Sequence, residues 1–202
     1  MTSPRSISRR TVLGGLAASG AALAGWPSVA APPQVPPRPP APHRVGTRLD
    51  RMTSYLTPFL DMHCPATQEN WQGFFAGAAD SRGAQYQLDW FLRDWRERIS
   101  VTTCPRLFWG LAAIAAEALT RGGSGRVTIL SGYRTPRTNA ILKGAAPDSF
   151  HMYGRAVDFR IDGLSSEETV RLARHLEIGG VGRYPVSDFT HIDSGRVRTW
   201  QG

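Results

Sequence analysis

The sequence predicts an α+β fold in which a small antiparallel sheet is flanked by helices. Apolar residues recur with helical spacing in some stretches and alternate with polar residues, as in strands, in others. Most of these stretches are joined by short turns. The chain has 202 residues, which is enough for one domain and too few to hold two comfortably. Elements of both kinds within one domain favour this fold class.

The first predicted elements are helical. Residues 45–85 have weak periodicity and are expected to be partly helical and partly irregular. Tyr86–Ile99 is predicted as an amphipathic helix, because its apolar residues form one stripe and its charged residues lie on the other face. The stripe consists of Leu88, Phe91, Leu92 and Trp95. Pro105–Leu119 is predicted as a buried, alanine-rich helix with proline in its first turn and a glycine pair after its end.

The second half of the domain is predicted to supply the sheet. Asn139–Lys143 is a short helical stretch, and Ser165 with Glu168 has the spacing of a capping box that begins a helix reaching Leu176. The other stretches alternate and are bounded by turn residues. The predicted strands are Arg126–Leu130, Gly154–Ile161, Gly179–Tyr184, Phe189–Asp193 and Arg196–Trp200.

Residues 1–31 are predicted to be an export signal. The pair Arg9 and Arg10 precedes a weakly apolar stretch rich in glycine and alanine, and small residues follow it at a potential cleavage site. The arginine pair resembles the twin-arginine signal, which directs folded proteins to export. The apolar stretch is short and glycine-rich, so no stable membrane span is expected after cleavage. Residues 32–44 are dense in proline and are expected to form an extended linker before the domain at 45–202.

The net charge of +8 at pH 7 indicates attraction to anionic partners such as nucleic acid, lipid headgroups or cell-wall polymer, or simply good solubility. Nucleic-acid binding has no motif to support it and conflicts with export. The two cysteines, Cys64 and Cys104, leave a disulfide and two free thiols equally open. Nothing in the sequence predicts an oligomeric state.

A histidine and an aspartate frame the stretch "HMYGRAVD". Gly154, Ala156 and Asp158 alternate, so they share one face of the predicted strand, and the two small residues leave space above it. His151 lies just before the strand, where a loop could fold its ring over the same face. Imidazole and carboxylate groups are zinc ligands, and a catalytic zinc usually has three protein ligands and one open position.

His191 is the best third ligand among the five histidines. It lies in "SDFTHIDSG", another alternating stretch, in which Phe189, His191 and Asp193 share a face. Two neighbouring strands could therefore present His151, Asp158 and His191 to one zinc ion. On spacing alone, polar residues that are merely hydrogen-bonded within strands remain the alternative.

Several blocks of the chain match a known family. They are, in order, "SGYRTPRTN", "SFHMYGRAVDF", "GGVGRYP" and "DFTHIDSGRVRTW". Together they resemble the murein endopeptidase K family, which is related to zinc D-Ala-D-Ala carboxypeptidases and dipeptidases, and the resemblance covers residues 86–200. It implies a fold of the zinc D-Ala-D-Ala carboxypeptidase type and one zinc ion per chain, held by His151, Asp158 and His191.

The resemblance also implies a function. It is that of a zinc metallopeptidase, a murein endopeptidase that hydrolyses peptide cross-links of peptidoglycan by a zinc-activated water. The implied partners are peptidoglycan stem peptides, and the implied location is the periplasm or cell-wall space, in agreement with the export signal. The alternative is a non-catalytic peptidoglycan-binding module on the same fold.

Three further residues are candidates for the reaction. In the related carboxypeptidases an arginine in the block of Arg134 holds a substrate carboxylate, while an arginine that orders its own loop is the alternative. Asp188 lies three positions before His191, as the catalytic acidic residue does in those enzymes, and is the preferred general base. Asp193 shares the face of His191 and is either the alternative base or a residue that steadies the His191 ring.

Overall fold

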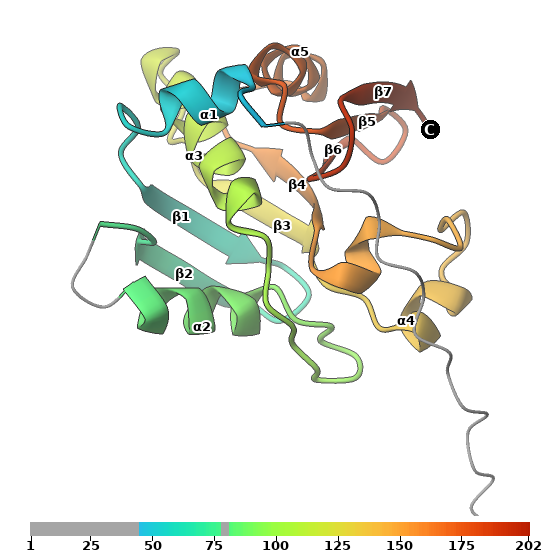
Figure 1. Cartoon of the computed structure of the whole chain (residues 1–202). Helices are drawn as coiled ribbons and strands as arrows, with labels where there is room; N and C mark the ends of the chain where they lie inside the picture. The colour runs from blue at the N-terminus through green and yellow to red at the C-terminus, as the bar shows by residue number, and fades with distance from the viewer. Residues whose placement is uncertain (1–44, 78–80) are drawn as a thin grey trace, which may run out of the picture. The chain divides into compact units, whose positions relative to one another are not determined.

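The computed structural model describes residues 45–77 and 81–202. The predicted export signal and proline-rich linker, residues 1–44, lie outside the described residues. No helix in the described part of the chain is long and apolar enough to cross a membrane. The α+β class is confirmed, because a sheet and several helices build one folded unit (Figure 1).

The sheet has seven strands and is larger than the sequence predicts. The strands are β1 Phe59–Cys64, β2 Glu69–Phe74, β3 Val127–Ser131, β4 Ala156–Ile161, β5 Gly180–Tyr184, β6 Phe189–Asp193 and β7 Arg198–Gln201. Their order across the sheet is β2-β1-β3-β4-β6-β5-β7. Neighbouring strands are antiparallel except β1 with β3 and β5 with β7, which are parallel.

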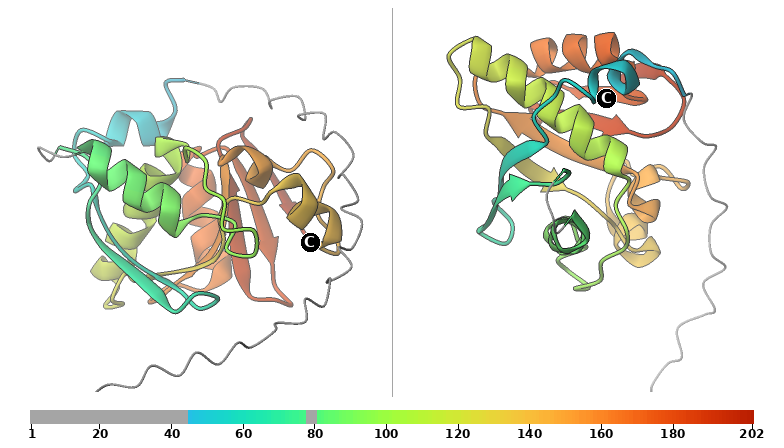
Figure 2. Two further views of the ribbon diagram at one scale, coloured as in Figure 1. Left: turned by 90° about the horizontal axis from the view of Figure 1, so that it is seen from below. Right: turned by 60° about the vertical axis from the view of Figure 1, so that its left-hand side comes forward.

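The described residues form five α-helices and one short 3₁₀ helix. They are α1 Arg48–Met52, α2 Ser81–Phe91, α3 Pro105–Thr120, α4 Pro136–Ile141, the 3₁₀ helix η1 Phe150–Tyr153 and α5 Ser166–Leu176. α1, α3 and α5 pack together, with α3 and α5 against the strands, and α2 lies beside β2 (Figure 2). Buried residues of the strands and helices, such as Phe159 and Leu111, form one core. Because side chains alternate across a strand, the residues between the core positions of β4 and β6 point to the opposite face.

Residues 45–85 contain more regular structure than predicted, because β1 and β2 pair there as an antiparallel hairpin. In β1 the residues Leu60, Met62 and Cys64 are buried between partly exposed neighbours, which is the alternation of a strand with one core-facing side. β2 has no fully buried residue. The composition of β2 therefore does not predict a strand by itself, and β2 forms because it pairs with β1.

The predicted helix Tyr86–Ile99 is wrong at both ends. The observed helix is α2, Ser81–Phe91, and Trp95 lies beyond it, 40% exposed. The helix does not continue because a carboxylate oxygen of Asp94 accepts hydrogen bonds from two following backbone N–H groups, at 3.1 and 3.4 Å, and forms a turn. Short polar side chains compete with helices in this way.

The other predicted elements lie close to their predicted bounds, although α4 begins earlier than expected, after Thr135, whose hydroxyl caps it. The capping box of α5 is present: the Ser165 hydroxyl accepts from the Glu168 backbone N–H and the Glu168 carboxylate accepts from the Ser165 N–H. Both cysteines, left open by the sequence, are free thiols.

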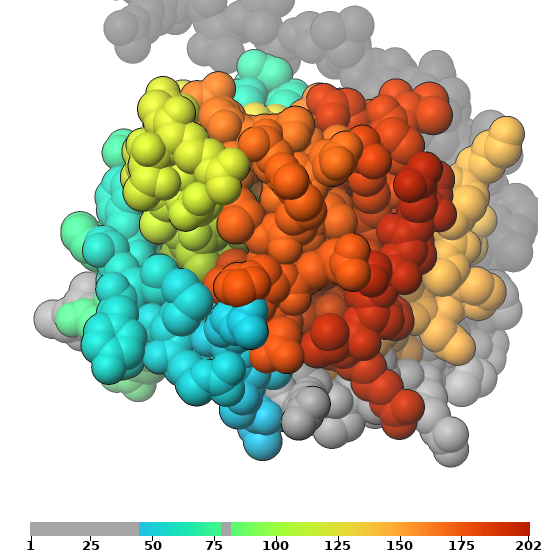
Figure 3. Space-filling view, turned by 90° about the horizontal axis from the view of Figure 1, so that it is seen from above, coloured from blue at the N-terminus to red at the C-terminus, as the bar shows by residue number. Residues whose placement is uncertain are grey.

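One buried arginine joins α1 to the rest of the domain. Arg106, in the first turn of α3, donates to the carbonyls of Ile178 at 2.6 Å and Glu177 at 2.9 Å and to the Thr47 hydroxyl at 2.6 Å, and it forms an ion pair with Asp50. Figure 3 shows the result at the surface, where α1, in cyan, lies against the orange segment that contains α5.

Arg106→Met is expected to destabilise the folded chain by about 2–4 kcal/mol, because it leaves buried carbonyl and hydroxyl groups without their donor. The measurement is urea unfolding, with a lower midpoint expected at unchanged slope. Arg121→Met is the matched control, since Arg121 makes only surface ion pairs with Glu117 and Glu168. Equal midpoints for the two variants would contradict a stabilising role for Arg106.

Candidate functional site

Three side chains that the sequence predicts as metal ligands converge on the sheet face opposite the core. Their ligand atoms, from His151, Asp158 and His191, all lie within 4.8 Å of one another. Asp158 Oδ1 is 2.7 Å from His191 Nδ1 and 3.2 Å from His151 Nε2, and these two ring nitrogens are 3.2 Å apart. All three residues are buried.

Sheet register and a short helix bring these residues together. Asp158 on β4 lies directly opposite His191 on β6, so the two side chains leave the sheet side by side. His151 is on η1, whose first backbone groups are capped by the Ser149 hydroxyl. Gly154 ends this helix with φ of 63°, and a Cβ there would lie 2.7 Å from the carbonyl oxygen of Thr102. Only glycine fits both constraints.

Hydrogen bonds orient the His151 ring for ligation. Its Nδ1 is 2.6 Å from the carbonyl oxygen of Gly132, which can only accept, so Nδ1 carries the proton and the Nε2 lone pair faces the cluster. Gly132 itself packs closely, since a Cβ there would lie 2.3 Å from the carbonyl oxygen of Leu92.

Asp193 holds the His191 ring from the other side. One carboxylate oxygen is 3.3 Å from His191 Nε2, and the other accepts from the backbone N–H groups of Gly180 at 3.1 Å and Gly195 at 2.8 Å. Arg198 donates to both oxygens, at 2.7 and 3.1 Å. Burial alone would raise the pKa of Asp193, but the hydrogen bonds from His191 and Arg198 outweigh it and lower the pKa to about 2. Asp193 is therefore an ionised, fixed acceptor.

The electrostatics of the cluster favour an ionised Asp158. Its burial would raise the pKa, but the charges and hydrogen bonds of His151 and His191 hold the pKa well below its usual value. Burial dominates for His151 and lowers the pKa of its ring. For His191 burial acts in the same direction, but hydrogen bonds to Asp158 and Asp193 outweigh it and raise the pKa to about 9.

Arg134 lies in the site, with its guanidinium directed at Asp158. Nη2 forms the ion pair with Asp158 Oδ2, and Nε donates to the Ser131 hydroxyl at 2.7 Å. Its backbone N–H also donates to the carbonyl of His151, at 3.1 Å. The contacts of the Arg134 side chain therefore order the site. Its remaining guanidinium nitrogen, Nη1, makes no hydrogen bond within the described residues.

The structure does not bring Asp188 to the cluster, so the preference for it as general base is corrected. Asp188 is exposed in the turn between β5 and β6, with φ of 46°. It lines a separate cavity of about 110 Å³ with Ser166 and Thr169 of α5. An odd number of positions separates Asp188 from His191, and strand alternation sends such side chains to opposite faces.

A cavity of about 600 Å³ opens over the cluster. Along one side it is lined by Tyr184, Phe189 and Trp200, which the sequence did not identify as site residues. The rings of Tyr184 and Phe189 stack with centroids 4.4 Å apart, and Trp200 Nε1 donates to the Tyr184 hydroxyl at 3.1 Å. The indole of Trp200 also lies 5.2 Å from the His191 ring, so this wall reaches the cluster.

Asp94 is a further residue of the site that the sequence does not predict. It is buried, and one carboxylate oxygen accepts from the Thr135 backbone N–H at 2.9 Å and from its hydroxyl at 3.0 Å. The Tyr133 N–H donates to the Leu92 carbonyl at 2.7 Å. These hydrogen bonds hold in place the loop that contains Arg134. No local signal marks Asp94, because its partners are about forty positions away.

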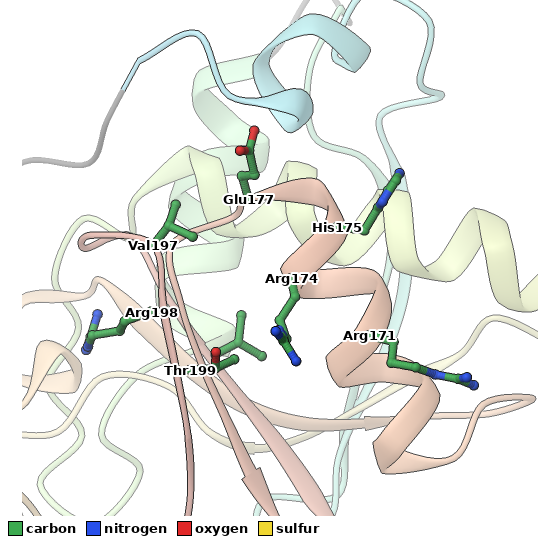
Figure 4. A pocket seen from close by; sticks show the side chains of 9 residues that line it. Arg171, Arg174, His175, Glu177, Val197, Arg198 and Thr199 are labelled. Atoms are coloured by element: carbon green, nitrogen blue, oxygen red, sulfur yellow. The ribbon is translucent and has the colours of Figure 1, made fainter.

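A different cavity, of about 530 Å³, lies between α5 and β7. Figure 4 shows Arg174 on α5 and Thr199 on β7 at this cavity. None of the clustered residues His151, Asp158 and His191 lines it. The cavity over the cluster is therefore the candidate active site.

The clustered residues fit a zinc ion. Two imidazoles and one carboxylate are a usual donor set for catalytic zinc, which keeps a further position open. Both rings have their second nitrogen engaged, His151 by a backbone carbonyl and His191 by Asp193. Such outer contacts set the tautomer of each ligand.

Comparisons with known proteins identify the family of this chain. The family model described as peptidoglycan L,D-endopeptidase MepK matches residues 54–200. A probable peptidoglycan L,D-endopeptidase MepK from Haemophilus influenzae is 38% identical over 120 residues, 57% of this chain and 63% of that protein, so this chain spans less than two thirds of its length. The Escherichia coli K12 peptidoglycan L,D-endopeptidase MepK is 36% identical over 131 residues, 63% of this chain and 70% of that protein. No solved structure matches significantly.

Proposed function

Because this chain belongs to the peptidoglycan L,D-endopeptidase MepK family, we propose that it is a zinc-dependent peptidase that hydrolyses L,D peptide cross-links of peptidoglycan. The observation that carries the proposal is the convergence of His151, Asp158 and His191 at the floor of an open cavity. A module that only binds peptidoglycan has no need of this buried ligand set. The arginine pair in residues 1–31, outside the described residues, supports export by the twin-arginine route to the periplasm or cell-wall space.

In this proposal His151 Nε2, a carboxylate oxygen of Asp158 and His191 Nδ1 hold the metal. Zinc in such a site polarises a carbonyl group and makes water a nucleophile at neutral pH. The ion pair with Arg134 orients Asp158, and Nη1 of Arg134 is available to a negatively charged oxygen of the substrate. Asp193 keeps the proton of His191 on Nε2, and the Trp200 ring packs beside the His191 ring.

The direct test is digestion of cross-linked muropeptides by the mature protein, followed by mass spectrometry of the products. Cleavage is expected with zinc, loss of cleavage with a chelator, and recovery when zinc is restored. Product masses identify the bond, which is expected to be an L,D cross-link, the bond named for the relatives. A zinc-loaded, folded protein that binds the muropeptides without cleaving them would instead support the binding module.

Arg134→Lys tests the arginine fork, because lysine keeps the charge but cannot bind in a bidentate manner. At saturating zinc we expect kcat/KM to fall by about tenfold or more, about 1.4 kcal/mol. The variant should keep its metal and its unfolding midpoint. Unchanged kcat/KM would show that Arg134 orders its loop without contacting substrate.

Zinc uptake is expected to release a proton. In the metal-free protein His191 has a pKa of about 9 and so is charged at pH 7, whereas Asp158 is already ionised and the pKa of His151 is lowered. A metal ligand must be neutral imidazole, so zinc displaces the proton from His191. Affinity should therefore fall about tenfold for each pH unit below 9. Calorimetry in buffers of different ionisation enthalpy measures the released proton, and a pH-independent affinity would contradict this.

A further inference from the structure

The charged side chains that line the cavity over the cluster differ in whether they are paired. Arg134 is paired with Asp158, and Arg198 with Asp193. Lys143 and Asp148 line the same cavity, and neither forms a hydrogen bond or ion pair within the described residues. Considering only the part of the chain that the structure describes, the cavity offers a substrate one unpaired cation and one unpaired anion.

Both unpaired charges belong to one ordered loop between α4 and η1. The residues between them that line the cavity are Gly144, Ala145 and Ala146, whose small side chains leave room beside the charges. The loop is anchored by Asn139 Nδ2, which donates to the Ala146 carbonyl at 2.9 Å, and by the Ala145 N–H, which donates to the Leu142 carbonyl at 3.2 Å. Lys143 and Asp148 are both exposed, so they are accessible to a large substrate.

We propose that Lys143 and Asp148 bind a zwitterionic end group of the substrate, a carbon that bears both a carboxylate and an ammonium. Lys143 contacts the carboxylate and Asp148 the ammonium. This inference rests on the proposed function, because it names the part of a cross-linked peptide that the loop recognises. Two opposite charges at the edge of a cavity select between substrates more than they add affinity, since they disfavour neutral and singly charged analogues.

Matched substrates test this assignment. They are one cross-linked peptide with the free zwitterionic end, the same peptide with that carboxylate amidated, and the same peptide with that amine acetylated. For the unmodified chain we expect KM to rise about three- to tenfold with each analogue, the range of an accessible charge contact, while kcat stays constant.

The variants should reproduce these losses selectively. Lys143→Met should raise KM for the zwitterionic peptide and make no difference with the amidated one. Asp148→Asn should behave in the same way with the acetylated peptide. Arg171→Met, on α5 and outside this cavity, is the control and should leave all three KM values unchanged. If the increase in KM caused by a variant is the same with the modified peptide as with the unmodified one, the variant residue does not contact the modified group, and the assignment is wrong.

Lys143 also permits a chemical test, because it is the only lysine of the sequence. Acetylation of the protein reports on this amine and the chain terminus alone. A zwitterionic product peptide should protect Lys143, and its amidated analogue should not; equal protection by both, or by neither, overturns the assignment. The two proposals fail differently: without cleavage of any cross-linked peptide the proposed function is wrong, whereas cleavage with equal KM for all three peptides overturns only the role of this loop.

Discussion

His191→Ala is expected to abolish zinc binding and to lower kcat/KM by about 10³-fold or more, about 4 kcal/mol. The mature chain should contain about one zinc ion when purified. His191 Nδ1 lies 2.7 Å from Asp158 Oδ1 and 3.2 Å from His151 Nε2, so its removal leaves two donors where a catalytic zinc needs three. His151→Ala and Asp158→Ala should have the same effect for the same reason.

Metal analysis of the three purified variants decides the assignment. His63→Ala is the matched control, since His63 is on β1 and contacts Asn70 rather than the cluster. It should keep both metal and activity. Full zinc occupancy in two of the three ligand variants would show that the metal lies elsewhere.

Asp193→Asn is expected to weaken zinc binding by roughly 10–100-fold, the usual consequence of losing the partner of a metal-bound histidine. Asparagine has the same shape, but it cannot carry the charge that Arg198 and His191 Nε2 contact. Activity should therefore be low at limiting zinc and should recover as zinc is added. A titration of kcat against zinc concentration measures this recovery.

The same variant separates two roles for Asp193. If Asp193 is the general base, the zinc-loaded variant should remain inactive, with kcat lower by about 10²–10⁴. We expect activity to recover with added zinc, because both carboxylate oxygens of Asp193 accept hydrogen bonds and its pKa of about 2 makes it a weak proton acceptor. Asp188→Asn is the control and should retain full activity, because Asp188 lines a different cavity. A loss of kcat in Asp188→Asn at full zinc occupancy would restore the spacing-based prediction.

Local signals in the sequence predicted many of the elements. α3 and α5 carry their own start signals, a first-turn proline and a capping box, and both have closely the predicted bounds. The burial of β6 does not alternate, because its last four residues are all buried, yet the turn residues on either side still predict its bounds, Phe189–Asp193. In contrast, β2 depends on β1 for its pairing, and the extension expected for α2 is prevented by the turn at Asp94.

The sequence by itself determined the fold class and the identity of the three clustered residues, because donor type and strand alternation are local properties that motif spacing records. Only the tertiary structure decided which side chains are already paired: Arg134 with Asp158, Asp193 with Arg198, and neither Lys143 nor Asp148 with any described residue. It also placed Asp188 outside the cavity. The physical reason is that charge pairing and access depend on contacts between elements distant in the chain, which spacing along one strand does not encode.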